Sequence, residues 1–155
     1  MCVRAGVFAD RDTARRELAA RLDDGRALEV FRHMILAHGG DARVIDDPHR
    51  LPQPGAAATV PAAATGTVAF VDAQRIGRIV LQLGGGRTST TDMIDPAAGI
   101  VRLVQAGDPV ERGQPLMRLL AKDGSRIAPL LAEAASAVQI TQESAPERRL
   151  ILEEA

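Results

Sequence analysis

The chain has 155 residues, a length that accommodates one medium-sized domain or a small domain with a helical extension. Hydrophobic residues make up 46% of it and charged residues 25%, which is the balance of a globular protein rather than a disordered one. The net charge of −1 offers no basic field to nucleic acid or a membrane surface. Aromatic residues make up only 2%, too few for the base-stacking platforms that bind single strands.

The single cysteine, Cys2, excludes an internal disulfide framework and a cysteine-based zinc site. No apolar run reaches transmembrane length, and no signal-peptide pattern opens the chain. We therefore expect a cytoplasmic protein.

Residues 1–43 are expected to form a helical segment. Ala14, Leu18 and Leu22 recur at four-residue intervals and predict a first helix that ends near Gly25. A second helix carries an apolar stripe and ends at Gly39, which suits a left-handed C-cap. The stripe comprises Ala27, Leu28, Phe31, Met34 and Ile35. Together the two helices predict an αα-hairpin with an apolar face that needs a partner.

Residues 44–58 are rich in proline and alanine and are expected to be a linker. Residues 59–155 are expected to form a domain of mixed helices and strands, which makes the whole chain α+β. The patterns predict strands at 59–64, 67–71, 99–104, 115–121, 138–141 and 150–152, and helices at 73–83 and 126–137.

The stretch Gly84-Gly85-Gly86-Arg87 has the composition of a phosphate-binding loop. A phosphate cradle, however, places its glycines before a helix N-terminus, where backbone amides and the positive end of the macrodipole face the anion. Here the glycines follow the predicted helix at 73–83, so they meet its negative end. The order favours a helix C-cap and turn.

A second glycine-bounded turn runs from Gly107-Asp108 through Val110 to Gly113 and Leu116, between two predicted strands. It resembles the hammerhead turn of barrel-sandwich domains, which include biotinyl and lipoyl carriers. In a carrier, the modified lysine would stand at Asp123. The only lysine, Lys122, is one residue early, and a one-residue slip turns a strand side chain to the opposite face.

No complete catalytic constellation is present. His33 and His38 are five residues apart on one predicted helix and do not form the i,i+4 pair of a metalloprotease helix, and His49 lies in the predicted linker. The carboxylates are expected to cap helices and turns; they include Asp46, Asp47, Asp92 and Asp95. No histidine neighbours the hydroxyls at 88–91 to activate one of them.

An ordered series of motifs resembles the C-terminal part of the pyrimidine-nucleoside phosphorylases. The series comprises Gly25-x-Ala27-Leu28-x-x-Phe31-x-x-Met34-Ile35-x-Ala37-x-Gly39-Gly40-Asp41, Leu51-Pro52, Gly66-x-Val68 with Asp72, Leu83-Gly84-Gly85-Gly86-Arg87, Ile94-Asp95 with Gly99-Ile100, and the turn at Gly107, Asp108 and Gly113. One departure is His38, where the family usually has glutamine. The resemblance extends over residues 13–152 and implies that the segment 1–43 ends the central α/β domain, while 59–155 forms an α/β-hammerhead domain related to barrel-sandwich hybrids.

The family is a pentosyltransferase that cleaves thymidine or uridine with inorganic phosphate to the base and (deoxy)ribose 1-phosphate. The resemblance places the phosphate loop and base-binding residues upstream of this chain, so it implies no catalytic, substrate-binding or metal-binding residue here, and no cofactor. It implies structural roles for Gly84, Gly85, Gly86, Arg87 and Asp95. We expect a fragment, inactive alone, whose partner is the N-terminal catalytic part of a homodimeric enzyme.

Two alternatives stay open. One is a biotinyl- or lipoyl-like carrier module that uses Lys122, and the other is a free-standing, non-catalytic binding module with the phosphorylase fold. If the chain is instead a fragment of the phosphorylase, the apolar stripe at 27–35 lacks the helices on which it normally packs, and the isolated chain is expected to self-associate or to expose that surface.

Overall fold

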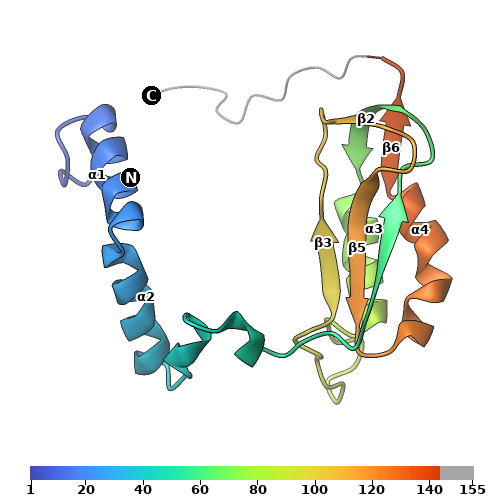
Figure 1. Cartoon of the computed structure of the whole chain (residues 1–155), viewed down its shortest axis with the longest axis horizontal. Coiled ribbons are helices and arrows are strands. Elements are labelled where there is room, and N and C mark those ends of the chain that lie inside the picture. Colours follow the sequence, from blue (N-terminus) through green and yellow to red (C-terminus); the bar gives the residue numbers. More distant parts are fainter. Residues whose placement is uncertain (144–155) are drawn as a thin grey trace. The chain divides into compact units, whose positions relative to one another are not determined.

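The computed structural model describes residues 1–143, and the expected strand at 150–152 lies outside them. The chain divides into two compact units, here named the helical unit (residues 1–51) and the sheet unit (residues 52–155). Figure 1 shows the elements of both units. Within the described residues, no helix is long and apolar enough to cross a membrane.

The helical unit consists of two α-helices and two short 3-10 turns. The bounds are α1 (Arg11–Asp23), α2 (Arg26–Ala37), η1 (Ala42–Val44) and η2 (Pro48–Arg50). The carboxylate of Asp10 caps α1 by accepting a 2.7 Å hydrogen bond from the amide of Thr13. Asp41 and Asp47 cap η1 and η2 in the same way, so these carboxylates have the capping roles that aspartates favour.

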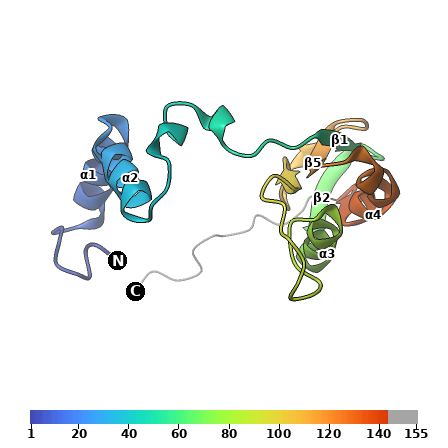
Figure 2. The same cartoon turned by 90° about the horizontal axis from the view of Figure 1, so that it is seen from below.

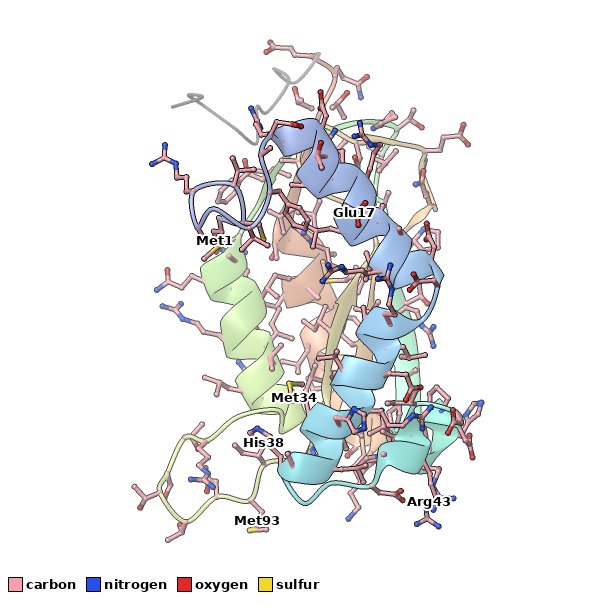
Figure 3. The ribbon with its side chains drawn as sticks, turned by 90° about the vertical axis from the view of Figure 1, so that its left-hand side faces the viewer. Met1, Glu17, Met34, His38, Arg43 and Met93 are labelled. Carbon is pink, nitrogen blue, oxygen red and sulfur yellow. The ribbon has the colours of Figure 1, made fainter. Side chains whose placement is uncertain are left out.

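The two helices of this unit do not form the expected αα-hairpin. α2 continues from the end of α1 around a bend, and Figure 3 shows the two helices meeting end to end, with Glu17 on α1 and Met34 on α2. Asp24 still donates its amide to Ala20, and the left-handed Gly25 (φ 83°) is the residue that separates it from α2. One left-handed residue bends the chain once, so the helices do not lie side by side.

The sheet unit contains two three-stranded antiparallel sheets. The first has the order β1 (Ala56–Pro61), β5 (Pro115–Ala121), β3 (Gly99–Arg102), and the second β4 (Pro109–Val110), β2 (Gly66–Val71), β6 (Val138–Thr141). β1 begins inside the stretch expected to be linker. Its register explains why, because Ala56 is paired with Ala121 at the far end of β5.

Two helices pack on one face of the first sheet, as Figure 2 shows. α3 (Ala73–Leu83) has the predicted bounds. The helix predicted at 126–137 is only partly α-helical: it consists of η3 (Gly124–Arg126), η4 (Ala128–Leu130) and α4 (Leu131–Ser136). Pro129 explains the difference, since proline has no amide to donate and disfavours the α conformation of the residue before it.

Residues of both sheets and of both helices form the core of the sheet unit. Val68, Ile79, Met117 and Leu119 have no exposed surface there. By contrast, the buried residues of the helical unit are Ala14 and Ala42, both small. The sheet unit therefore has a hydrophobic core of its own, whereas residues 1–51 do not.

Candidate functional site

The first part of the candidate site is the glycine run at the end of α3. Gly84 is left-handed (φ 106°) and donates its amide to Leu81, while Gly85 donates to Val80. This pattern is a Schellman C-cap, in which a glycine takes the left-handed position because it has no Cβ. The carbonyl end of α3 therefore faces this site, which disfavours phosphate. The structure thus confirms the predicted C-cap.

Asp95 connects the loop that follows to this cap through a backbone hydrogen bond. The amide of Asp95 donates to the carbonyl oxygen of Gly84 over 2.9 Å, and its carboxylate accepts from the amide of Ala97 over 3.0 Å. Gly85 passes so close to the loop that a Cβ there would lie 2.8 Å from the carbonyl oxygen of Ala98. The loop from 86 to 98 is therefore anchored at both ends by backbone contacts.

The tip of this loop is a self-contained turn around Asp92. Its carboxylate accepts hydrogen bonds from the hydroxyl and amide of Thr88 and from the amide of Ser89, at 2.6, 2.9 and 2.8 Å. The Thr88 hydroxyl and these two amides hold the pKa of Asp92 below its ordinary value. Arg87 is exposed and has no ion pair among the described residues. These hydroxyls serve the turn rather than nucleophilic chemistry.

A hollow of about 620 Å³ lies beside the cap. Its lining comprises Leu83, Gly84, Met93, Ile94, Asp95, Lys122, Asp123 and Arg126. The Arg126 guanidinium reaches over the cap, where its Nη1 lies 3.0 Å from the place a Cβ of Gly84 would occupy. Met93 projects from the loop and is 90% exposed (Figure 3).

Both charged and apolar side chains line this hollow. It presents two carboxylates and two cationic side chains, and its described lining includes no histidine, cysteine or serine that could act as nucleophile or base. Asp123 is engaged as the cap of η3, since its carboxylate accepts from the amide of Ser125 over 2.9 Å. That backbone hydrogen bond is the main reason that the pKa of Asp123 is lowered.

The turn at 107–113 holds the two sheets together. Both glycines are left-handed: Gly107 (φ 97°) donates to the carbonyl of Val68, and Gly113 (φ 87°) donates to that of Ala62. The carboxylate of Asp108 accepts from the amide of Gln105 over 2.8 Å. Val110 is 2% exposed and Leu116 is 1% exposed, so both side chains belong to the core. These residues are structural.

The carrier hypothesis has little support from this geometry. Lys122 follows the end of β5 and is exposed, but the chain continues into the helical turns η3 and η4 rather than into a partner strand. Carriers present their lysine at the tip of a hairpin, and neither Lys122 nor Asp123 stands at one.

The three histidines are spread over the helical unit. His33 is exposed on α2, His38 is the C-cap of that helix, and His49 lies in η2. Within the described residues, no group of three or more histidine, cysteine, aspartate or glutamate side chains is placed to hold a metal ion.

The comparisons with known proteins point to one family. Residues 67–141 match the pyrimidine nucleoside phosphorylase C-terminal domain. The chain is 41% identical over 110 residues to the pyrimidine-nucleoside phosphorylase of Bacillus subtilis, covering 71% of this chain and 25% of that protein. It is 40% identical over 145 residues to the thymidine phosphorylase of Burkholderia lata, covering 93% of this chain and 32% of that protein.

The chain belongs to the pyrimidine-nucleoside phosphorylase family and matches its C-terminal part. A thymidine phosphorylase from Burkholderia orbicola is 39% identical over 129 residues. The chain spans between a quarter and a third of the length of these relatives. This is the family that the ordered series of motifs in the sequence resembles.

The sequence interpretation found the cap and the turn but missed the hollow beside them. The hydrogen bond between their backbones brings Gly84 and Asp95 together. Lys122 and Arg126 join them from the segment after β5, and no sequence signal links these separate segments. Only the pairing of β5 between β1 and β3 places its end beside α3.

Proposed function

We propose that this chain forms the C-terminal, non-catalytic part of a pyrimidine-nucleoside phosphorylase. The observation that carries the proposal is the match to the thymidine phosphorylase of Burkholderia lata, which includes 93% of this chain. The hollow beside Gly84 supports the non-catalytic role, because both of its carboxylates are engaged by backbone amides, that of Asp95 by Ala97 and that of Asp123 by Ser125.

The activity of the whole enzyme is phosphorolysis. Thymidine or uridine reacts with inorganic phosphate to give the free base and (deoxy)ribose 1-phosphate. The catalytic groups and the phosphate site belong to the N-terminal part of a cytoplasmic homodimer, and this chain requires no cofactor or metal. The two sheets and the glycine-bounded turn at 107–113 support an α/β-hammerhead domain. The helical residues 1–43 end the central domain, and the C-terminal domain begins with β1 at Ala56 rather than at residue 59, so that residues 44–55 connect the two.

In this enzyme the sheet unit acts as a rigid support. Its buried core fixes α3 and β5, and these in turn fix the anchored loop at 86–98 and the hollow that it borders. The loop and the hollow keep their shape through residues that do not contact the reacting atoms. These residues are Gly84, Gly85, Gly86, Arg87 and Asp95.

Two assays test the proposal. The isolated chain, supplied with thymidine and phosphate, is expected to release no thymine. A chimera of the Burkholderia lata enzyme, in which this chain replaces the matching C-terminal segment, is expected to release thymine in a phosphate-dependent manner. Robust turnover by the isolated chain contradicts the non-catalytic role, and an inert but folded chimera contradicts the assignment to this enzyme.

A further inference from the structure

The helical unit leaves a large apolar surface uncovered. On α2 the exposed fractions are 47% for Leu28, 69% for Val30, 47% for Phe31 and 50% for Met34. None of the twelve residues of α2 is buried. A helix of this composition is stabilised in proteins mainly by packing of its apolar face, so the unit lacks the contacts that would hold it.

The uncovered residues spread over a wide arc of α2. At 100° per residue, the positions from Val30 through Phe31 to Leu28 span about 160° of the helix circumference. A helix on the surface of a globular protein has an apolar stripe of about 100°. The wider arc indicates burial on more than one side, inside a larger body, rather than against one flat face of a second copy.

Charged side chains occupy much of the opposite side of α2, where Leu36 is also 55% exposed. The Arg32 guanidinium forms two hydrogen bonds with the Asp46 carboxylate, at 2.9 and 3.0 Å, and also contacts Glu29 at 3.4 Å. The Arg32–Asp46 pair holds the segment that follows η1 close to the charged side of α2. This arrangement leaves the apolar arc as the open side of the helix.

A hollow marks the bend between the two helices. Its volume is about 890 Å³, and its lining includes Leu18 and Leu22 from α1 and Leu28 and Val30 from α2. Leu22 is 72% exposed and Leu18 is 43% exposed. The bend at Gly25 therefore makes a concave apolar notch that is continuous with the arc of α2.

We infer that the notch and the apolar arc of α2 form the surface that binds the catalytic part of the phosphorylase, an inference that rests on the proposed function. The match to the Burkholderia lata enzyme includes 93% of this chain, so it includes most of residues 1–51, and 68% of that enzyme lies outside the match. The Burkholderia lata enzyme thus contains a large additional part against which the helical unit can pack. Its contact surface is apolar and enters the notch between α1 and α2.

The experiment compares hydrogen exchange in the isolated 155-residue chain with exchange of the same residues in the active chimera. The isolated chain is held at a concentration where light scattering shows a monomer. The amides of α2 are expected to exchange at least about tenfold more slowly in the chimera, and those of β5 to change far less, because β5 is already buried in the sheet unit.

Matched variants localise the effect. Leu28→Gln and Leu103→Gln replace leucines that are each 47% exposed, the first in the notch and the second on the sheet unit. Leu28→Gln is expected to raise the rate of thermal inactivation of the chimera about tenfold, and Leu103→Gln to change it less than about twofold. Leu22→Gln is a second notch variant. The exchange measurement itself needs no substitution.

The other outcomes overturn the inference in distinguishable ways. An active chimera in which α2 exchanges as fast as in the isolated monomer overturns the docking surface and leaves the proposed function standing. Protection of α2 by pairing of two isolated chains, with no further protection in the chimera, identifies a second copy as the occupant. A folded chimera without turnover overturns the proposed function and the inference together.

Discussion

The backbone amide of Asp95 donates a hydrogen bond to the carbonyl oxygen of Gly84 over 2.9 Å, and this contact closes the loop that leaves α3. Gly84 accepts it in the left-handed conformation of the cap, with φ at 106°. The geometry of the loop and of the adjacent hollow therefore depends on one glycine.

Replacing this glycine tests the cap. Gly84→Ala is expected to lower the free energy of unfolding by about 1–2 kcal/mol, because a Cβ disfavours the left-handed conformation. Gly77→Ala is the matched control, since Gly77 lies within α3 and a Cβ there meets nothing within 4 Å. It is expected to stabilise the helix by about 0.5–1 kcal/mol. Urea unfolding followed by circular dichroism measures the free energy of unfolding of both variants. Equal changes of the same sign would contradict the special role of Gly84 in the cap.

The centre of the sheet unit offers a test of the core. Leu119 on β5 has no exposed surface, so Leu119→Ala is expected to cost about 2–5 kcal/mol through lost contacts and the cavity that remains. Leu103→Ala removes the same atoms from a half-exposed position and is expected to change stability by less than about 0.5 kcal/mol. Chemical denaturation measures the free energy of unfolding of both variants. A loss for Leu119→Ala as small as that for Leu103→Ala would place Leu119 outside the core.

The Asp92 turn predicts a specific pH dependence. Its hydrogen bonds lower the pKa of Asp92 in the folded state, so their stabilising contribution is complete above the pKa of the unfolded state, about 3.9, and is lost as the pH falls through the lower folded value. Thr88→Val removes the hydroxyl that is the largest cause and is expected to raise the pKa. Carboxyl-carbon NMR titration of Asp92 measures the shift; an unchanged midpoint in the variant would contradict this account.

The exposed stripe predicts dye binding by the isolated chain. Phe31 on α2 is 47% exposed beside other apolar side chains, whereas Phe70 on β2 is 51% exposed on the sheet unit. Phe31→Ser is expected to reduce the fluorescence of a hydrophobic dye and any self-association more than Phe70→Ser does. Dye titration and light scattering check this, and a wild-type chain that is strictly monomeric and binds no dye would rule it out.

The carrier alternative has its own test at Lys122. After co-expression with a biotin or lipoate ligase, the intact chain is expected to keep its unmodified mass, because Lys122 precedes a helical turn instead of standing at a hairpin tip. Intact-mass spectrometry measures the outcome. A stoichiometric adduct lost in Lys122→Arg would revive the carrier hypothesis.

Local sequence signals were sufficient for the elements whose residues interact with near neighbours. Spacing and the conformational freedom of glycine are sufficient to predict the bounds of α3, its glycine cap and the strand at 115–121. Each depends on hydrogen bonds within a few residues, which the order of the side chains determines directly.

The contacts between distant segments were decided only by the tertiary structure. Pairing with β5 turned the end of the expected linker into β1. The shortened helix after Pro129, by contrast, has a local cause in the sequence. One left-handed residue at Gly25 produced a bend where the sequence suggested a hairpin. The hollow around Gly84, Lys122 and Arg126 exists because a sheet joins segments that are far apart in the chain, and long-range pairing leaves no periodic signal in any one of them.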